Sequence, residues 1–71
     1  MKKLELWEVS GDEPEFARAS ATLLPDGKIK YIGTGLQGIL TKFLHLDLNQ
    51  VFDDLDGWSN GWVSLRLKGG E

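Results

Sequence analysis

Hydrophobic and polar residues alternate along three stretches in the first half of the chain. In residues 3–9, Leu4 and Leu6 lie on one side and Glu5, Trp7 and Val9 on the other. A period of two is typical of a strand with one buried face. Residues 16–24 alternate strictly, and residues 28–32 alternate again. The alanines in 16–24 also favour a helix, but the strict alternation and the turn that follows favour a strand.

Turn-forming residues separate these three predicted strands. Residues 10–14, SGDEP, predict a loop. Pro25-Asp26-Gly27 predicts a tight hairpin, because proline presets φ for the second turn position and glycine accepts positive φ. The three strands therefore form a predicted meander, and the alanines of 16–24 leave room for a bulky element to pack closely on one face.

The middle of the chain changes to a helical period. One apolar stripe has the spacing i, i+3, i+4, i+7 and i+8, formed by Leu36, Ile39, Leu40, Phe43 and Leu44. Thr34 is the expected N-cap of this helix. A second short helix is predicted over residues 48–56, with Asp47 as its cap, Gln50 completing a capping box and Gly57 ending it.

Residues 62–68 return to alternation and predict a last strand. Its apolar side is Val63, Leu65 and Leu67, and its polar side is Trp62, Ser64, Arg66 and Lys68. The resulting order, β-β-β-α-(α)-β, predicts a single domain over residues 1–71. We expect an α+β fold, a small antiparallel sheet with one or two short helices packed on one face.

Composition excludes several chemistries. The chain has 71 residues, no cysteine and one histidine, His45, so we expect no disulfide, no metal site and no cofactor. A chain this short has a small core, and self-association is the remaining route to extra stability. The net charge is −3, and the eight basic residues are spread along the sequence, which argues against nucleic acid as a partner.

The start of the chain and its hydropathy bear on localisation. Glutamates interrupt the apolar run of MKKLELWEV, which is not the pattern of a signal peptide. No run of eighteen apolar residues occurs, so no membrane span is expected. Together with the lack of cysteine, these features predict a cytoplasmic protein.

Two tryptophans flank a predicted hairpin tip in DGWSNGWVSLRL. A three-residue loop, Ser59-Asn60-Gly61, would place Trp58 and Trp62 opposite each other across the ladder. One interpretation is a structural pair, because cross-strand aromatic pairs contribute up to about 1 kcal/mol.

The other interpretation is a binding surface for another protein. Trp62 lies on the polar side of its strand with Arg66, and Trp7 points away from the apolar side of the first strand. Exposed tryptophan beside arginine is enriched at binding hot spots. Trp58, Trp62, Arg66 and Trp7 are therefore the candidate partner-binding residues, and the favoured function is a small non-enzymatic regulatory domain. Stacking of the rings on a small ligand or a sugar is an alternative.

Three further motifs do not predict catalysis or ion binding. In FDDLDGWSNG the spacing fails a calcium loop, because Gly57 as its sixth position would place Phe52 first. GTGLQG matches a dinucleotide fingerprint, but a hairpin strand precedes it, so its glycines are expected to serve the turn and close helix packing. His45 and the paired aspartates form no recognisable catalytic set, and no enzyme activity is expected.

The last residues offer one family resemblance. Leu65 to Gly70, LRLKGG, resembles the diglycine tail of ubiquitin-like proteins, which is activated and conjugated. The resemblance covers six residues, and Glu71 after it would have to be removed. It implies, as an alternative function, a ubiquitin-like modifier or sulfur carrier, although that family places its helix after two strands.

Overall fold

The computed structural model describes residues 2–9 and 17–68, and within them the chain forms a four-stranded antiparallel sheet with two short helices. The elements are β1 (Lys3–Glu8), β2 (Ala19–Leu23), β3 (Ile29–Ile32), α1 (Leu36–Leu40), the 3₁₀ turn η1 (Thr41–Phe43), α2 (Leu48–Asp54) and β4 (Val63–Lys68). The predicted α+β class and the order β-β-β-α-α-β are confirmed. Three strands precede the first helix, which departs from the ubiquitin-like order. The predicted loop 10–14, Phe16 and the diglycine lie outside the described residues.

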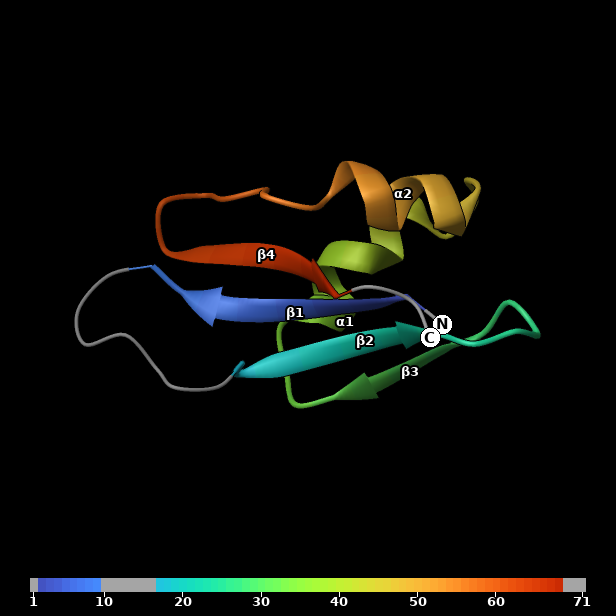
Figure 1. Ribbon diagram of the computed structural model, residues 1–71, viewed down its shortest axis with the longest axis horizontal. Helices are drawn as coiled ribbons and strands as arrows, with labels where there is room; N and C mark the ends of the chain where they lie inside the picture. Colours follow the sequence, from blue (N-terminus) through green and yellow to red (C-terminus); the bar gives the residue numbers. More distant parts are fainter. Residues whose placement is uncertain (1, 10–16, 69–71) are drawn as a thin grey trace.

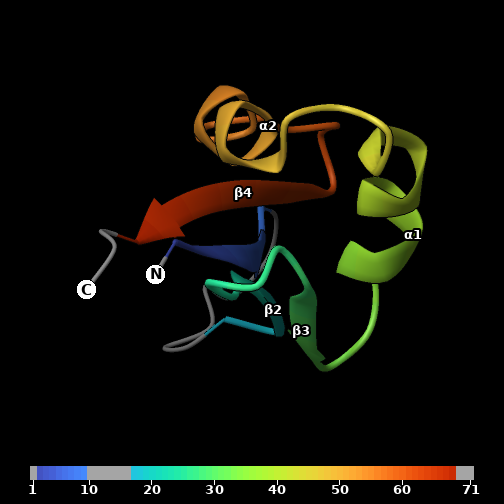
Figure 2. The ribbon, with the colours of Figure 1, turned by 90° about the vertical axis from the view of Figure 1, so that its right-hand side faces the viewer.

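The sheet order is β3-β2-β1-β4, so the last strand pairs with the first (Figure 1). Leu4 lies opposite Leu67, and Leu6 opposite Leu65. This register puts the apolar sides of both strands on the same face, because side chains alternate between the two faces of a sheet. The helices pack on that face, and the other face of the sheet carries no described helix (Figure 2).

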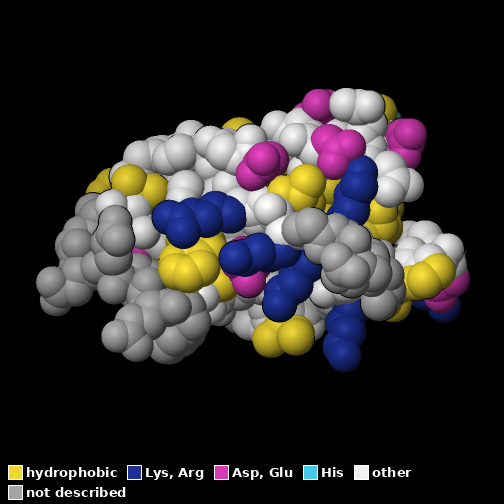
Figure 3. Space-filling view, in the orientation of Figure 1, with side chains coloured by type: hydrophobic (Ala, Val, Ile, Leu, Met, Phe, Trp, Pro, Cys, Tyr) yellow, Lys and Arg dark blue, Asp and Glu magenta, His cyan; other side chains and the backbone are white. Residues whose placement is uncertain are grey.

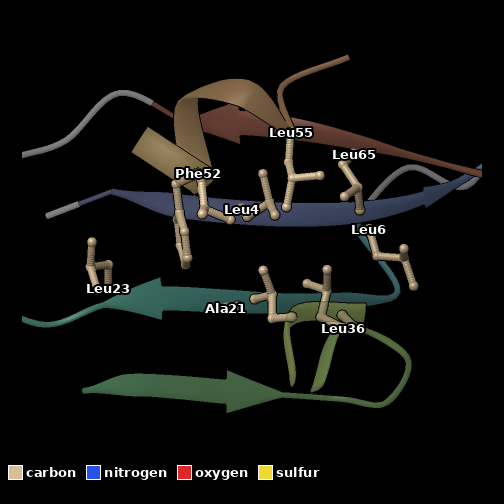
Figure 4. Packing of buried hydrophobic residues seen from close by; sticks show 11 residues of the cluster. Leu4, Leu6, Ala21, Leu23, Leu36, Phe52, Leu55 and Leu65 are labelled. Atoms are coloured by element: carbon tan, nitrogen blue, oxygen red, sulfur yellow. The ribbon is translucent and has the colours of Figure 1, made fainter. Parts of the chain in front are cut away.

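The core lies between the sheet and the helices (Figure 4). Its largest fully buried side chains are Phe52, Leu4, Leu36, Leu40 and Leu65. Ala19 and Ala21 of β2 are also buried, and their small side chains let α1 approach β2 closely, as the sequence predicts.

The β2–β3 hairpin has the predicted turn. The Leu24 amide donates to the Lys28 carbonyl at 2.8 Å, and the Gly27 amide donates to the Leu24 carbonyl at 3.0 Å. Gly27 has φ +88°, the left-handed conformation that the last turn position requires.

The start and end of α1 differ from the prediction. Gly35, with φ 108°, occupies the N-cap position without a side-chain cap, so the assignment of Thr34 as N-cap is wrong. The cause is a sharp bend between β3 and α1 at which only glycine accepts the backbone angle. The stripe also ends early, because the chain tightens into η1 and Leu44 is 51% exposed.

The cap of α2 is as predicted, and its capping box is not. The Asp47 carboxylate accepts from the Asn49 amide at 3.1 Å. Gln50 donates through Nε2 to Asp54 at 2.9 Å, so it does not complete the box. The helix ends at Asp54, two residues before its predicted end, and Gly57 follows with φ +85°.

Candidate functional site

The sheet face opposite the helices carries polar and charged side chains from all four strands, and we call it the open face. Cross-strand register and alternation define its residues: Lys3, Glu5, Trp7, Ser20, Thr22, Lys30, Ile32, Ser64, Arg66 and Lys68. Each of these positions is adjacent along its strand to a residue that faces the core.

Trp7 and Arg66 meet on the open face. The guanidinium carbon of Arg66 lies 4.5 Å from the centroid of the Trp7 ring. The pairing of β1 with β4 brings them together, because Trp7 lies opposite Ser64 and Arg66 opposite Glu5, which makes the two residues diagonal neighbours. A cation over an indole face at this distance contributes about 0.5–1 kcal/mol at an exposed site.

Glu5 contacts the indole of this pair. Its carboxylate accepts a hydrogen bond from Trp7 Nε1 at 3.2 Å. It also lies 3.8 Å from the Lys3 ammonium and 3.9 Å from that of Lys68, and its side chain is 12% exposed. The indole therefore has its edge held by a carboxylate and its face covered by a guanidinium.

Trp58 lies away from this group. It is half-buried and packs against the helix side of the core. Its carbonyl accepts from the Leu65 amide at 2.8 Å, so its backbone pairs with the outer edge of β4. The ring lines a recess of about 360 Å³ together with Ile39, Lys42, Phe43, Leu55 and Asn60.

Trp62 stands at the tip of the hairpin and is 76% exposed. The predicted opposition of Trp58 and Trp62 is wrong, because Ser59 bridges to Ser64 and Trp58 pairs with Leu65. The turn is tighter than predicted because the Asn60 side chain accepts from the amides of Trp62 at 2.9 Å and Val63 at 3.0 Å. Trp62 is therefore part of the turn.

The backbone of Trp62 also joins the first strand. Its carbonyl accepts from the Val9 amide at 3.0 Å, which extends the β1–β4 ladder by one pair beyond Glu8 and Val63. Of the four candidate partner-binding residues, the structure thus brings Trp7 and Arg66 into contact, places Trp62 at the adjoining turn, and leaves Trp58 on the helix side.

The aspartates near α2 have structural partners. Asp53 accepts from the Lys2 ammonium at 2.8 Å, and Asp56 accepts from the Leu67 amide at 3.1 Å. Over residues 2–9 and 17–68, no three acidic or histidine side chains gather where they could hold a metal ion. In the same part of the chain, no helix combines the length and apolar character needed to cross a membrane.

Sequence reasoning did not find Glu5 or the lysines of the open face. The sequence feature that points to these lysines is alternation, because each occupies a polar position of an alternating strand: Lys3, Lys30 and Lys68. Their convergence depends on β4 pairing with β1, and that pairing cannot be inferred from local alternation.

Comparison with family models, curated protein sequences and solved structures finds no match for this chain. The geometry of the open face is therefore the basis for inferring a function.

Proposed function

We propose that this protein is a small non-enzymatic binding domain whose open face is the interface for another protein. The observation that carries the proposal is the Trp7–Arg66 pair, held at 4.5 Å on a sheet face that no described helix covers. Tryptophan and arginine dominate binding hot spots, because both combine a large apolar area with a polar group. A pair already held in one geometry loses little side-chain entropy on binding.

The surroundings of the pair support an interface of useful size. Trp62 projects from the turn beside the open face with 76% of its surface exposed. Ile32 is 58% exposed on the strand at the opposite edge. The open face thus has exposed apolar groups towards two of its edges, with the Trp7–Arg66 pair between them. Tryptophan and arginine are enriched in protein interfaces.

The test is affinity capture from a cell lysate, read by mass spectrometry, with substitutions on and off the open face. Arg66→Ala and Trp7→Leu remove the two members of the pair, while Lys42→Ala removes an exposed cation from η1 on the helix side. We expect both open-face variants to weaken capture of the same partner by about 30-fold, and Lys42→Ala to leave it unchanged. If circular dichroism shows that both open-face variants are folded and they still capture the partner, the proposal is wrong.

The recess beside Trp58 favours a second candidate function, the binding of a small ligand such as a sugar. Its walls combine the rings of Trp58 and Phe43 with the polar groups of Lys42 and Asn60, and an apolar recess with a few polar groups is typical of ligand sites. Titration with a panel of mono- and disaccharides, followed by tryptophan fluorescence, should then give a saturable change that Trp58→Leu removes. A change that persists in Trp58→Leu would contradict this assignment.

A further inference from the structure

The open face is positively charged although the whole chain is negative. It carries four cations, on Lys3, Lys30, Arg66 and Lys68, and among its described residues one carboxylate, that of Glu5. The local excess is therefore three positive charges, on a chain whose net charge is −3. Arg18 is a further nearby cation, but it is paired with Glu8 at 3.2 Å.

Among the residues that the structure describes, the acidic side chains concentrate on a different part of the molecule. Asp47, Asp53, Asp54 and Asp56 lie on α2 or next to its ends, and all four are exposed. Figure 3 shows Lys and Arg side chains gathered over the strands, around a hydrophobic group, and Asp and Glu side chains gathered towards α2. Over residues 2–9 and 17–68, positive charge therefore gathers on the open face and negative charge around α2.

Lys3 and Lys68 lie directly opposite each other in the β1–β4 register. Like charges in directly opposite positions destabilise a sheet. Glu5 offsets this repulsion only in part, because its oxygens lie 3.8 and 3.9 Å from the two ammonium groups, longer than the 2.8 Å of the Lys2–Asp53 pair. A second carboxylate between Lys3 and Lys68 would complete the neutralisation.

We propose that the partner of the open face is an acidic protein surface, with carboxylates seated near Lys3 and Lys68 and an apolar group against Trp7 and Arg66. This inference rests on the proposed function and adds the chemical character of the partner. Complementary charge on the two sides of an interface raises the association rate and excludes wrongly charged partners. Because the attraction between exposed charges is screened over about 8 Å at physiological salt, affinity should fall as salt is raised.

Carboxylates of a protein fit this surface better than the phosphates of a nucleic acid. Nucleic-acid affinity depends on neutralising many successive phosphates, and the open face has four cations. The Glu5 carboxylate lies among these cations on β1, opposite Arg66 of β4, and would repel a continuous line of phosphates. Discrete acidic side chains can be placed on either side of it.

The direct test is a nuclear magnetic resonance titration of the isotope-labelled full chain with two polyanions, poly-L-glutamate and a thymidine oligonucleotide of equal charge. The amide signals of β1 and β4 and the Trp7 indole signal should shift with poly-L-glutamate at a concentration where the oligonucleotide has a smaller effect. The inference is overturned if the oligonucleotide binds more tightly, if α2 signals shift instead, or if the open-face signals do not move.

Two single substitutions test whether poly-L-glutamate binding depends on contact with the open face or only on the net charge of the chain. Lys68→Gln and Lys42→Gln each remove one positive charge, the first from the open face and the second from η1. Lys68→Gln should weaken poly-L-glutamate binding about two- to fivefold, the double variant Lys3→Gln/Lys68→Gln should weaken it further, and Lys42→Gln should not. Equal effects of the two single substitutions would overturn the inference. Signal dispersion reports whether each variant is folded.

The captured partner distinguishes failure of this inference from failure of the proposed function. If Trp7→Leu and Arg66→Ala release the partner and Lys3→Gln/Lys68→Gln also releases it, both are supported. If the folded lysine variant retains the partner while the Trp7 and Arg66 variants lose it, the open face is an interface but the partner is not held by its acidity. If all variants retain it, the proposed function fails as well.

Discussion

Replacing Gly33 by alanine is expected to destabilise this protein more than the same substitution at its other described glycines. Gly33 follows β3 with φ +80°, and a Cβ at this position would lie 2.6 Å from the Arg18 carbonyl oxygen and 3.0 Å from Ala19 Cα. Both neighbours are backbone atoms, so relief of the contact requires β3 to move away from β2. The close approach of these strands therefore depends on the missing side chain.

The expected loss of stability in Gly33→Ala is the sum of two free-energy terms, and substitutions at other glycines isolate one term at a time. Gly27 has φ +88°, and a Cβ added there would have no atom within 4 Å, so Gly27→Ala should cost only the left-handed backbone term, about 1–2 kcal/mol. Gly33 has a similar φ, and its substitution by alanine adds overpacking, which costs a further amount of about 1–3 kcal/mol. Gly38 lies within α1 with open space around an added Cβ and no positive φ, so Gly38→Ala should stabilise by up to about 1 kcal/mol.

Urea unfolding followed by far-ultraviolet circular dichroism ranks the three variants. The expected order of midpoints is Gly38→Ala, wild type, Gly27→Ala and Gly33→Ala. A domain of this size has a total stability of only about 4–10 kcal/mol, so Gly33→Ala should be unfolded in part of the population without denaturant if the domain lies near the lower value. A Gly33→Ala midpoint equal to that of Gly27→Ala would refute the close contact with Arg18.

Two further changes test the turn and the edge of the sheet. Asn60→Ala removes the acceptor of the Trp62 and Val63 amides and should lower the unfolding free energy by about 1–2 kcal/mol. Asn60→Asp keeps an acceptor and should retain most of that free energy. Equal losses in the two variants would contradict the role of the side-chain oxygen. Burial raises the pKa of Tyr31 above 10.0, so the folded state holds the phenol proton more tightly than the unfolded state. Stability should therefore fall as pH rises above about 10. Urea titrations at pH 8 and pH 11 should show a smaller loss of stability in Tyr31→Phe than in the wild type. An equal loss in both proteins would contradict the role of Tyr31.

Local pattern was sufficient for most of the elements. The alternation of residues 3–9 and 62–68 predicted β1 and β4 and their buried sides, and Pro25-Asp26-Gly27 predicted the β2–β3 turn. These features are local, because strand period and turn chemistry depend on a few neighbouring residues. The Asp47 cap is local in the same sense.

Two of the wrong predictions depended on neighbours in space. Thr34 has a favourable residue type for an N-cap, but the bend needed to bring α1 over Leu6 places Gly35 there, where a Cβ would lie 3.0 Å from Leu6 Cδ2. The Trp58 ring was expected opposite Trp62, but the Asn60 side chain closes a tighter turn and Trp58 packs on the core instead.

The sequence by itself determined the class of fold, the strands with their buried sides, and the identity of Trp7, Trp62 and Arg66 as polar-side residues. The tertiary structure decided which of them meet. β4 pairs with β1 from the other end of the chain and so places Arg66 over Trp7 and opposite Glu5, and Lys3 opposite Lys68. The physical reason is that alternation sets which face a side chain occupies, whereas strand order and register, which depend on how the whole core packs, set its neighbours on that face.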